Sequence, residues 1–247
     1  QLTVKIYPTV QQMGKAAAQE VADRICNLLE GKAEINMIFA AAPSQEEFLH
    51  HLISDQRISW NRINAFHMDE YIGVLPDAPQ SFGNFLRIRI FDKVPFKNVY
   101  YLNGHATDLE EECTRYTSLL SQFPTDIVCL GIGENGHIAF NDPDVANFND
   151  HKLVKIVKLD HVCRQQQVNE KCFETLEQVP TEALTLTIPA LLKAKWMFCI
   201  VPFKNKSQAV YRTIHGDISE KCPASILRRK EKSSLYLDTE SAQLLNL

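Results

Sequence analysis

Short apolar runs bounded by turn residues recur along this chain, and longer segments with an apolar residue every three or four positions lie between them. The first pattern is typical of buried strands and the second of helices that pack on a sheet. Strands are predicted at residues 2–7, 34–41, 64–67, 99–102, 126–130, 153–159, 196–201 and 234–237. Helices are predicted at residues 11–29, 44–54, 82–91, 108–122 and 206–215, and residues 184–192 begin like a strand and end like a helix.

The alternation of strands and helices predicts an α/β protein: a single doubly wound, mainly parallel sheet with helices on both faces and a small lid. The length of 247 residues fits one domain over residues 1–247. Residues 141–152 are the least periodic stretch, and we expect a mobile flap that begins there and extends to about residue 180.

In parallel sheets of this kind, ligands bind beyond the carboxyl ends of the strands. This rule places four loops on one rim of the predicted sheet, and they are the loops after Ala41, His67, Leu130 and Val201. Candidate functional residues are therefore sought in those loops.

Composition narrows the classes of partner. The net charge is −4 and the sequence pI is near 6.1, which argues against a nucleic-acid partner but not against a small anion. No apolar run reaches membrane-spanning length, so no membrane partner is expected. The seven cysteines include no C-x-x-C pair, which favours reduced thiols in a cytoplasmic protein over disulfides or a zinc site.

The loop after the strand at 126–130 holds the densest polar cluster of the chain. It reads Gly-Ile-Gly-Glu-Asn-Gly-His-Ile-Ala-Phe-Asn-Asp-Pro over residues 131–143. Asn135 and Asp142 lie close enough in sequence to orient the ring of His137, an arrangement typical of a histidine that transfers protons. Two other interpretations are a glycine-rich turn with a capping histidine and a dinucleotide fingerprint at residues 131–136. The fingerprint requires a helix that starts in the loop, which Pro143 opposes.

Two adjacent acids, Asp69 and Glu70, follow the strand at 64–67. Neighbouring side chains on an extended backbone point to opposite sides, so at most one of them faces a ligand. We expect Asp69 to be a general base and Glu70 to have a structural role.

Small residues and a helix start follow the strand that ends at Ala41. Ala41 and Ala42 leave room for a ligand to reach backbone N–H groups, as at phosphate sites on helix N-termini. Ser44 and Glu47 alone would be explained by a capping box. Lys206 opens a later helix and can close over an anion on the same rim, with Arg164 and Lys171 as further positive charges.

These residues resemble the glucosamine-6-phosphate deaminase (isomerase) family, which is related to the 6-phosphogluconolactonases. The resemblance covers nearly the whole chain. Its most specific parts are the segments 130–143 and Met-Asp-Glu-Tyr-Ile-Gly at 68–73. It implies conversion of glucosamine 6-phosphate and water into fructose 6-phosphate and ammonia, with no metal and no organic cofactor.

The resemblance also implies roles for individual residues. His137 would open the pyranose ring, tuned by Asn135 and Asp142, and Asp69 would move a proton between C2 and C1. Ser44 and the neighbouring backbone would hold the phosphate, with Lys171 and Lys206 as its cationic ligands. The partner would be a small sugar phosphate, and a homo-oligomer is compatible with the family.

Three departures from the family pattern bear on these roles. Residues 41–45 read Ala-Ala-Pro-Ser-Gln in place of a glycine-rich Thr-Gly-Gly-Thr-Pro loop, and Pro43 removes one N–H donor. Asp142 stands where Glu is more usual. Residues 144–152 do not resemble a basic allosteric site, so no activation by an acetylated amino sugar phosphate is expected.

Three functions remain open on the sequence. The first is an amino sugar 6-phosphate isomerase/deaminase, with galactosamine 6-phosphate as an alternative substrate. The second is hydrolysis of a sugar lactone of the 6-phosphogluconolactone type, which needs the histidine but not Asp69. The third is a non-catalytic sugar-phosphate-binding protein, against which the presence of both Asp69 and His137 argues.

Overall fold

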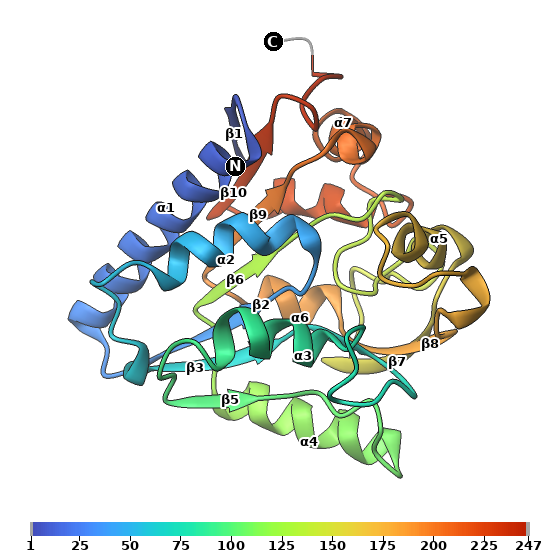
Figure 1. Cartoon of the computed structure of the whole chain (residues 1–247), viewed down its shortest axis with the longest axis horizontal. Coiled ribbons are helices and arrows are strands. Elements are labelled where there is room, and N and C mark those ends of the chain that lie inside the picture. The colour runs from blue at the N-terminus through green and yellow to red at the C-terminus, as the bar shows by residue number, and fades with distance from the viewer. Residues whose placement is uncertain (1, 246–247) are drawn as a thin grey trace.

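The computed structural model describes residues 2–245 (Figure 1). The strands are β1 Thr3–Tyr7, β2 Ile35–Phe39, β3 Ile63–His67, β4 Asp69–Tyr71, β5 Asn98–Tyr100, β6 Ile127–Leu130, β7 Val154–Lys158, β8 Glu182–Leu186, β9 Trp196–Val201 and β10 Ser233–Asp238. The α-helices are α1 Val10–Gly31, α2 Glu46–Ile53, α3 Phe82–Leu86, α4 Leu109–Gln122, α5 His161–Asn169, α6 Ile188–Leu192 and α7 Ser207–His215.

Single turns of other helix types complete the secondary structure. A π-helical turn, η3 Arg87–Phe91, continues α3. The 3₁₀ turns are η1 Pro43–Gln45, η2 Trp60–Arg62, η4 Leu176–Gln178, η5 Lys204–Lys206 and η6 Pro223–Arg229.

Seven strands form the main sheet in the order β1-β10-β9-β6-β2-β3-β5, and every pairing in it is parallel. This confirms the predicted mainly parallel α/β architecture. The chain runs outward from β2 through β3 to β5 and then returns to β6 on the other side of β2. The direction of winding therefore switches between β2 and β6, the place where such sheets bind ligands.

Alternate residues of the central strands face two different cores. In β2, Ile38 belongs to a core that includes residues of α4, α6 and α7, whereas Met37 and Phe39 belong to a core formed with α1, α2 and α3. All five residues of β2 are buried, as expected for a strand covered on both faces. Figure 1 shows α1, α2 and α3 along one face of the sheet.

A second, three-stranded antiparallel sheet departs from the prediction of a single sheet. Its order is β4-β8-β7, and it takes up the predicted strand at 153–159 and the first part of 184–192. The chain leaves the main sheet at Met68, directly after β3, and continues as β4. Since β4 pairs with β8, with Asp69 opposite Thr185, the first acid after β3 lies at the junction of the two sheets.

The remaining differences concern helices and loops. Helix α5 was not predicted, because most of its residues are polar. Residues 143–153 contain neither helix nor strand, and Asn141 and Asp142 before them are fully buried. Within residues 2–245 no helix combines the length and the apolarity needed to cross a bilayer.

Candidate active site

A cavity open to solvent lies at the carboxyl ends of the central strands. The loops after β2, β3 and β6 all contribute to it, as predicted, together with α5 and the turn before α7. Its lining residues are Ala40, Ala41, Ala42, Ser44, Met68, Asp69, Phe82, Gly131, Ile132, Gly133, His137, Ala139, Phe140, Gln166, Gln167 and Lys206.

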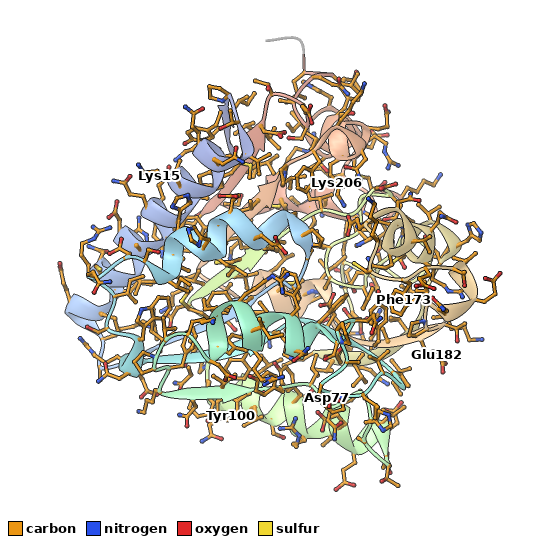
Figure 2. The ribbon with its side chains drawn as sticks, viewed as in Figure 1. Lys15, Asp77, Tyr100, Phe173, Glu182 and Lys206 are labelled. Atoms are coloured by element: carbon orange, nitrogen blue, oxygen red, sulfur yellow. The ribbon has the colours of Figure 1, made fainter. Side chains whose placement is uncertain are left out.

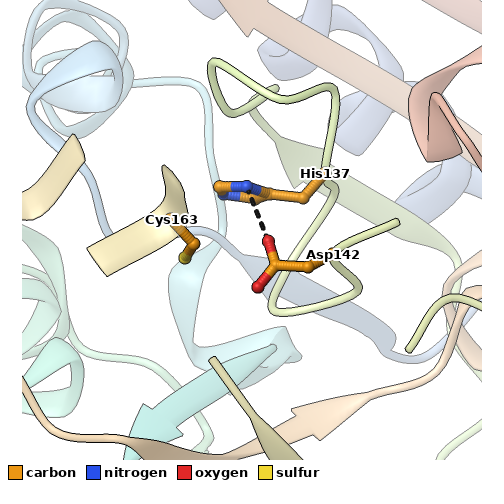
Figure 3. Close-up of side chains that lie close together, drawn as sticks. All are labelled: His137, Asp142 and Cys163. Atoms are coloured by element: carbon orange, nitrogen blue, oxygen red, sulfur yellow. Dashed lines mark ion pairs between the residues drawn. The ribbon is translucent and has the colours of Figure 1, made fainter. Parts of the chain in front are cut away.

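His137 is held by two oxygen atoms on the same side of its ring. Its Nδ1 lies 2.7 Å from Asn135 Oδ1. The same nitrogen lies 3.1 Å from Asp142 Oδ1, the ion pair marked in Figure 3. Both oxygens accept hydrogen bonds, so Nδ1 carries a proton. In the neutral ring this leaves Nε2 as the nitrogen that can exchange a proton with a ligand.

A hydrogen-bond network fixes these two partners. The amide of Asn135 donates to Asp142 Oδ1 at 3.1 Å and to Asp160 Oδ2 at 2.9 Å. Burial of Asp142 works against its charged form, but the hydrogen bonds from His137 and Asn135 outweigh burial and lower the pKa of Asp142. Asp142 is therefore a carboxylate at neutral pH and stabilises positive charge on His137.

Glycine is required under the imidazole and at the turn before it. A Cβ atom on Gly133 would lie 1.9 Å from Cε1 of His137, so the ring occupies the space of a side chain there. Gly136 has a φ of +89°, which side chains disfavour. Ala139, two residues after His137, has a φ of +50°, and such strain in a non-glycine residue is typical of functional sites.

Asp69 reaches the same cavity from the second sheet. Its side chain is buried, and no donor within residues 2–245 makes a hydrogen bond to its carboxylate. Burial, reinforced by the charge of the adjacent Glu70, raises the pKa of Asp69 well above its ordinary value. A carboxylate with free oxygens and a raised pKa is suited to accept a proton from a bound ligand.

Glu70 points away from the cavity and organises the backbone. One carboxylate oxygen accepts from the N–H groups of Tyr71 and Phe82, and the other accepts from Ser81 Oγ and the N–H of Gly83, all at 2.9–3.0 Å. The structural role predicted for Glu70 is confirmed, as is the expectation that only one of the two acids faces the cavity.

The Ser44 loop differs from the capping box predicted for it. The N-cap position of α2 is Gln45, which makes no side-chain capping bond, because the 3₁₀ turn Pro43–Gln45 precedes the helix. Gln45 instead donates from Nε2 to Ser44 Oγ at 3.1 Å and to the carbonyl of Ile200 at 3.2 Å. Since Ser44 Oγ accepts that bond, its own hydrogen is free to point into the cavity.

The cations predicted around the cavity are not equivalent. Lys206 is 3% exposed and is the one lysine or arginine in the cavity lining. It forms an ion pair at 3.0 Å with Glu170, a residue that the sequence did not single out. Lys171 is exposed and lines a different hollow, beside Pro79 and Gln80. Arg164 donates to main-chain carbonyls of Leu176 and Val179, a structural role.

Three side chains at the site have the composition of a metal cluster. Ligand atoms of His137, Asp142 and Cys163 lie within 4.8 Å of one another (Figure 3). Burial and the nearby carboxylates raise the pKa of Cys163 well above its ordinary value, so its sulfur remains a thiol, whereas metals bind the thiolate. The nitrogen of His137 in this group is already bonded to Asn135, so the group is better fitted to hold a proton than a metal.

Helix α5 supplies the residues that sequence reasoning missed. Gln166 and Gln167 line the cavity, and Gln166 Oε1 accepts from the N–H of Glu134 at 2.9 Å. The signal available in the sequence was Asp160, which caps the helix by accepting from the N–H of Cys163 at 2.6 Å. Capping alone could not show that this helix packs over the cavity.

Residues 8–236 match the family described as glucosamine-6-phosphate isomerases/6-phosphogluconolactonase. A glucosamine-6-phosphate deaminase of Listeria innocua is 36% identical over 212 residues, which is 86% of this chain and 88% of the relative. One from Bacillus cereus is 39% identical over 188 residues, which is 76% of this chain and 70% of the relative.

Solved structures agree with this grouping. A structure described as a monomeric glucosamine-6-phosphate deaminase has a TM-score of 0.88 and 31% identity, and the match covers 98% of this chain and all of that one. A 6-phosphogluconolactonase from Thermotoga maritima has a TM-score of 0.79 at 21% identity, covering 96% of this chain and all of that one. The second likeness concerns the fold alone.

Proposed function

This chain belongs to the glucosamine-6-phosphate isomerase/6-phosphogluconolactonase family, and from that premise we propose that it is an amino sugar 6-phosphate isomerase/deaminase. It is an enzyme of this superfamily, and the proposed reaction converts glucosamine 6-phosphate and water into fructose 6-phosphate and ammonia. One observation carries the proposal: an unbonded carboxylate with a raised pKa and an oriented imidazole line one cavity.

The first step is opening of the pyranose ring. His137 in its imidazolium form gives the Nε2 proton to the ring oxygen as the bond from that oxygen to C1 breaks, and the neutral imidazole then takes up the proton that the C1 hydroxyl loses, giving the open-chain amino aldehyde. Asp142 supports this transfer, since its negative charge stabilises the imidazolium form.

The second step moves a proton between neighbouring carbons. Asp69 removes the proton from C2 and the carbonyl oxygen on C1 gains the proton held by His137, which yields an enolamine. Asp69 then returns its proton to C1, and the nitrogen on C2 gives one proton back to His137 and becomes an imine. Water adds to C2 and ammonia leaves, which gives the ketose. A base of raised pKa close to C2 suits this exchange.

The phosphate fixes the sugar far from the reacting carbons. We assign it to Lys206, the Ser44 hydroxyl, and the N–H groups of Ala41 and Ala42. Lys171 belongs to the same proposal only for a conformation in which residues 170–171 have moved toward the cavity. Binding of the phosphate at a distance from the reacting carbons holds C1 and C2 in position for the reaction.

The deciding experiment compares three substrates. The purified chain is incubated with glucosamine 6-phosphate, galactosamine 6-phosphate and 6-phosphogluconolactone, and ammonia, ketose 6-phosphate and acid release are measured. We expect ammonia and fructose 6-phosphate in equal amounts from glucosamine 6-phosphate. Lactone hydrolysis without ammonia release from either amino sugar would replace this proposal with the lactonase function.

Partners and location are part of the same proposal. The substrate is a small sugar phosphate, and a homo-oligomer is compatible with the fold, although one similar solved structure is described as monomeric. In residues 2–245 the seven cysteines are free thiols, which supports a reducing compartment such as the cytoplasm. A mass measurement in solution at micromolar concentration tests the oligomeric state.

A further inference from the structure

Glu170 places a carboxylate on the cation of the proposed phosphate subsite. Its Oε1 accepts from Lys206 Nζ at 3.0 Å. The Lys206 side chain is 4% exposed and that of Glu170 is 14% exposed, so the ion pair is largely shielded from bulk water. Figure 2 labels Lys206 between α7 and the segment that carries α5. The ammonium group assigned to the substrate therefore already has an anionic partner.

A second contact holds Glu170 in this position. The side-chain amide of Gln166, one helical turn earlier, donates to the same oxygen at 2.9 Å. The backbone N–H of Glu170 also donates to the carbonyl of Gln166 at 2.8 Å. Glu170 is thus fixed at the end of α5, whose other end is capped by Asp160, the partner of Asn135.

If a phosphate dianion and the Glu170 carboxylate both contact the Lys206 ammonium group, the two anions repel each other strongly. Together they bring three negative charges to one positive charge, in a part of the cavity lined by Ala41 and Ala42. Like charges in contact repel strongly where water is scarce. Phosphate must therefore displace Glu170, or it binds more weakly while Glu170 stays.

We propose that Glu170 competes with the substrate's phosphate for Lys206 and thereby sets the affinity of the phosphate subsite. The inference rests on the proposed function for the identity of the anion. The apparent affinity for phosphate equals the intrinsic affinity multiplied by the fraction of molecules in which Lys206 is free. A phosphate dianion must displace the carboxylate of Glu170 to reach Lys206, so removal of that carboxylate strengthens phosphate binding.

The test is the substitution Glu170→Gln, with Glu174→Gln as its matched control. Both remove one negative charge from the same segment, but Glu174 is exposed and is not the ion-pair partner of Lys206. Binding of inorganic phosphate to the full chain is measured by calorimetry. We expect Glu170→Gln to bind phosphate at least about fivefold more tightly than the unmodified protein, and Glu174→Gln to differ by less than about twofold.

If the ion pair between Glu170 and Lys206 only stabilises the fold, the substitutions at Glu170 will not tighten phosphate binding. If Glu170→Gln and Glu170→Ala, both checked for an unchanged fold by circular dichroism, bind phosphate no more tightly than the unmodified chain, the competition does not exist. Phosphate binding does not require turnover, so the two proposals fail separately. Tighter phosphate binding in a chain that releases no ammonia from glucosamine 6-phosphate would reject the proposed reaction and keep the role of Glu170. Turnover with unchanged phosphate binding would do the reverse.

Discussion

Asp69 and His137, to which we assign the proton transfers, have opposite surroundings. Asp69 is buried, no donor among residues 2–245 makes a hydrogen bond to its carboxylate, and burial raises its pKa. His137 is surrounded by partners that fix its ring, through Asn135 at 2.7 Å and Asp142 at 3.1 Å. The partners of His137 come from one loop, so sequence spacing sufficed to predict them, whereas the state of Asp69 depends on what the fold packs around it.

The substitution Asp69→Asn separates activity from stability. We expect turnover of glucosamine 6-phosphate to fall by roughly 10²-fold or more, because the amide cannot accept the C2 proton. We also expect the variant to be more stable at pH 7. Burial raises the pKa of Asp69 in the folded state, so above the ordinary pKa the unfolded chain ionises this group more readily than the folded chain does. This difference lowers the free energy of unfolding at pH 7, and asparagine, which does not ionise, removes the effect.

Kinetics and urea unfolding at pH 7 measure the two effects of Asp69→Asn. The stability difference should shrink as the pH falls to the ordinary range of aspartic acid, near 3.9. Near-normal turnover would remove Asp69 from the mechanism. Lower stability at neutral pH would mean that the buried carboxyl has partners in solution that the structure lacks.

The substitution His137→Gln tests ring opening. The glutamine side chain cannot protonate the ring oxygen, so the loss should be larger on the closed pyranose than on an open-chain substrate. Turnover of glucosamine 6-phosphate is compared with that of an acyclic analogue which enters at the open-chain stage. Equal losses on both would contradict the role assigned to His137 and point to the proton shuttle instead.

At the scale of elements, the connection from β3 through β4 to α3 positions the base. β4 begins at Asp69, and the next residue, Glu70, binds the N-terminus of α3 through Ser81, Phe82 and Gly83. Fixing Glu70 fixes the direction of its neighbour, because adjacent side chains on a strand point to opposite sides. The two adjacent acids thus act as one structural unit with different tasks.

The substitution Glu70→Gln should destabilise this unit. The carboxylate accepts four hydrogen bonds, and an amide offers one oxygen and a donor that faces the N–H of Gly83. Loss of buried hydrogen bonds of this kind costs about 1–3 kcal/mol. Urea unfolding measures the change, with Glu174→Gln as an exposed control. Unfolding free energies that agree within error would show that Glu70 is dispensable for the fold.

Helix α5 shows what element prediction misses. Its sequence, His-Val-Cys-Arg-Gln-Gln-Gln-Val-Asn, has three consecutive glutamines and no apolar stripe, so periodicity did not reveal it. Two of these glutamines, Gln166 and Gln167, line the cavity, so polar side chains of the helix face inward. Hydrophobic periodicity does not reveal a helix that faces a cavity with polar side chains, because both its outer and its inner positions are then polar.

At the scale of the whole molecule, both sheets and both cores meet near the cavity. The main sheet supplies the Ser44 and His137 loops, and the antiparallel sheet supplies Asp69. We propose that residues 1–247 act as one domain, since the site is incomplete without either sheet. A mobile flap over residues 141–180 remains a prediction, which hydrogen exchange with and without ligand can test.

A buried histidine in the centre of the molecule links stability to pH. His67 is fully buried, and its Nε2 accepts from the N–H of Leu102 at 2.9 Å. Burial lowers the pKa of His67 to about 4 from an ordinary value of 6.5. Between pH 6.5 and about 4 only the unfolded chain takes up a proton at this histidine. The contribution of neutral His67 to the free energy of unfolding is therefore fully present above pH 6.5. It decreases by about 3 kcal/mol as the pH falls to about 4.

The substitution His67→Gln should remove this dependence. Its amide oxygen can still accept from Leu102, so unfolding free energies in urea are compared across pH 4–7. The decrease toward acid pH should be smaller by about 3 kcal/mol than in the unmodified chain. His105→Gln, at an exposed position, is the control and should keep the original slope. An unchanged slope in His67→Gln would show that other groups cause the acid sensitivity.

The sequence by itself determined the main sheet, most helices, the rim where the cavity lies and the His137 loop. Those features depend on periodicity and on residues close together along the chain, where spacing fixes geometry. Only the tertiary structure decided that β4, β7 and β8 form a separate sheet, that α5 lines the cavity, and that Glu170 pairs with Lys206. These outcomes depend on burial and on contacts between segments far apart in the sequence. Local sequence patterns do not determine which distant residues come into contact.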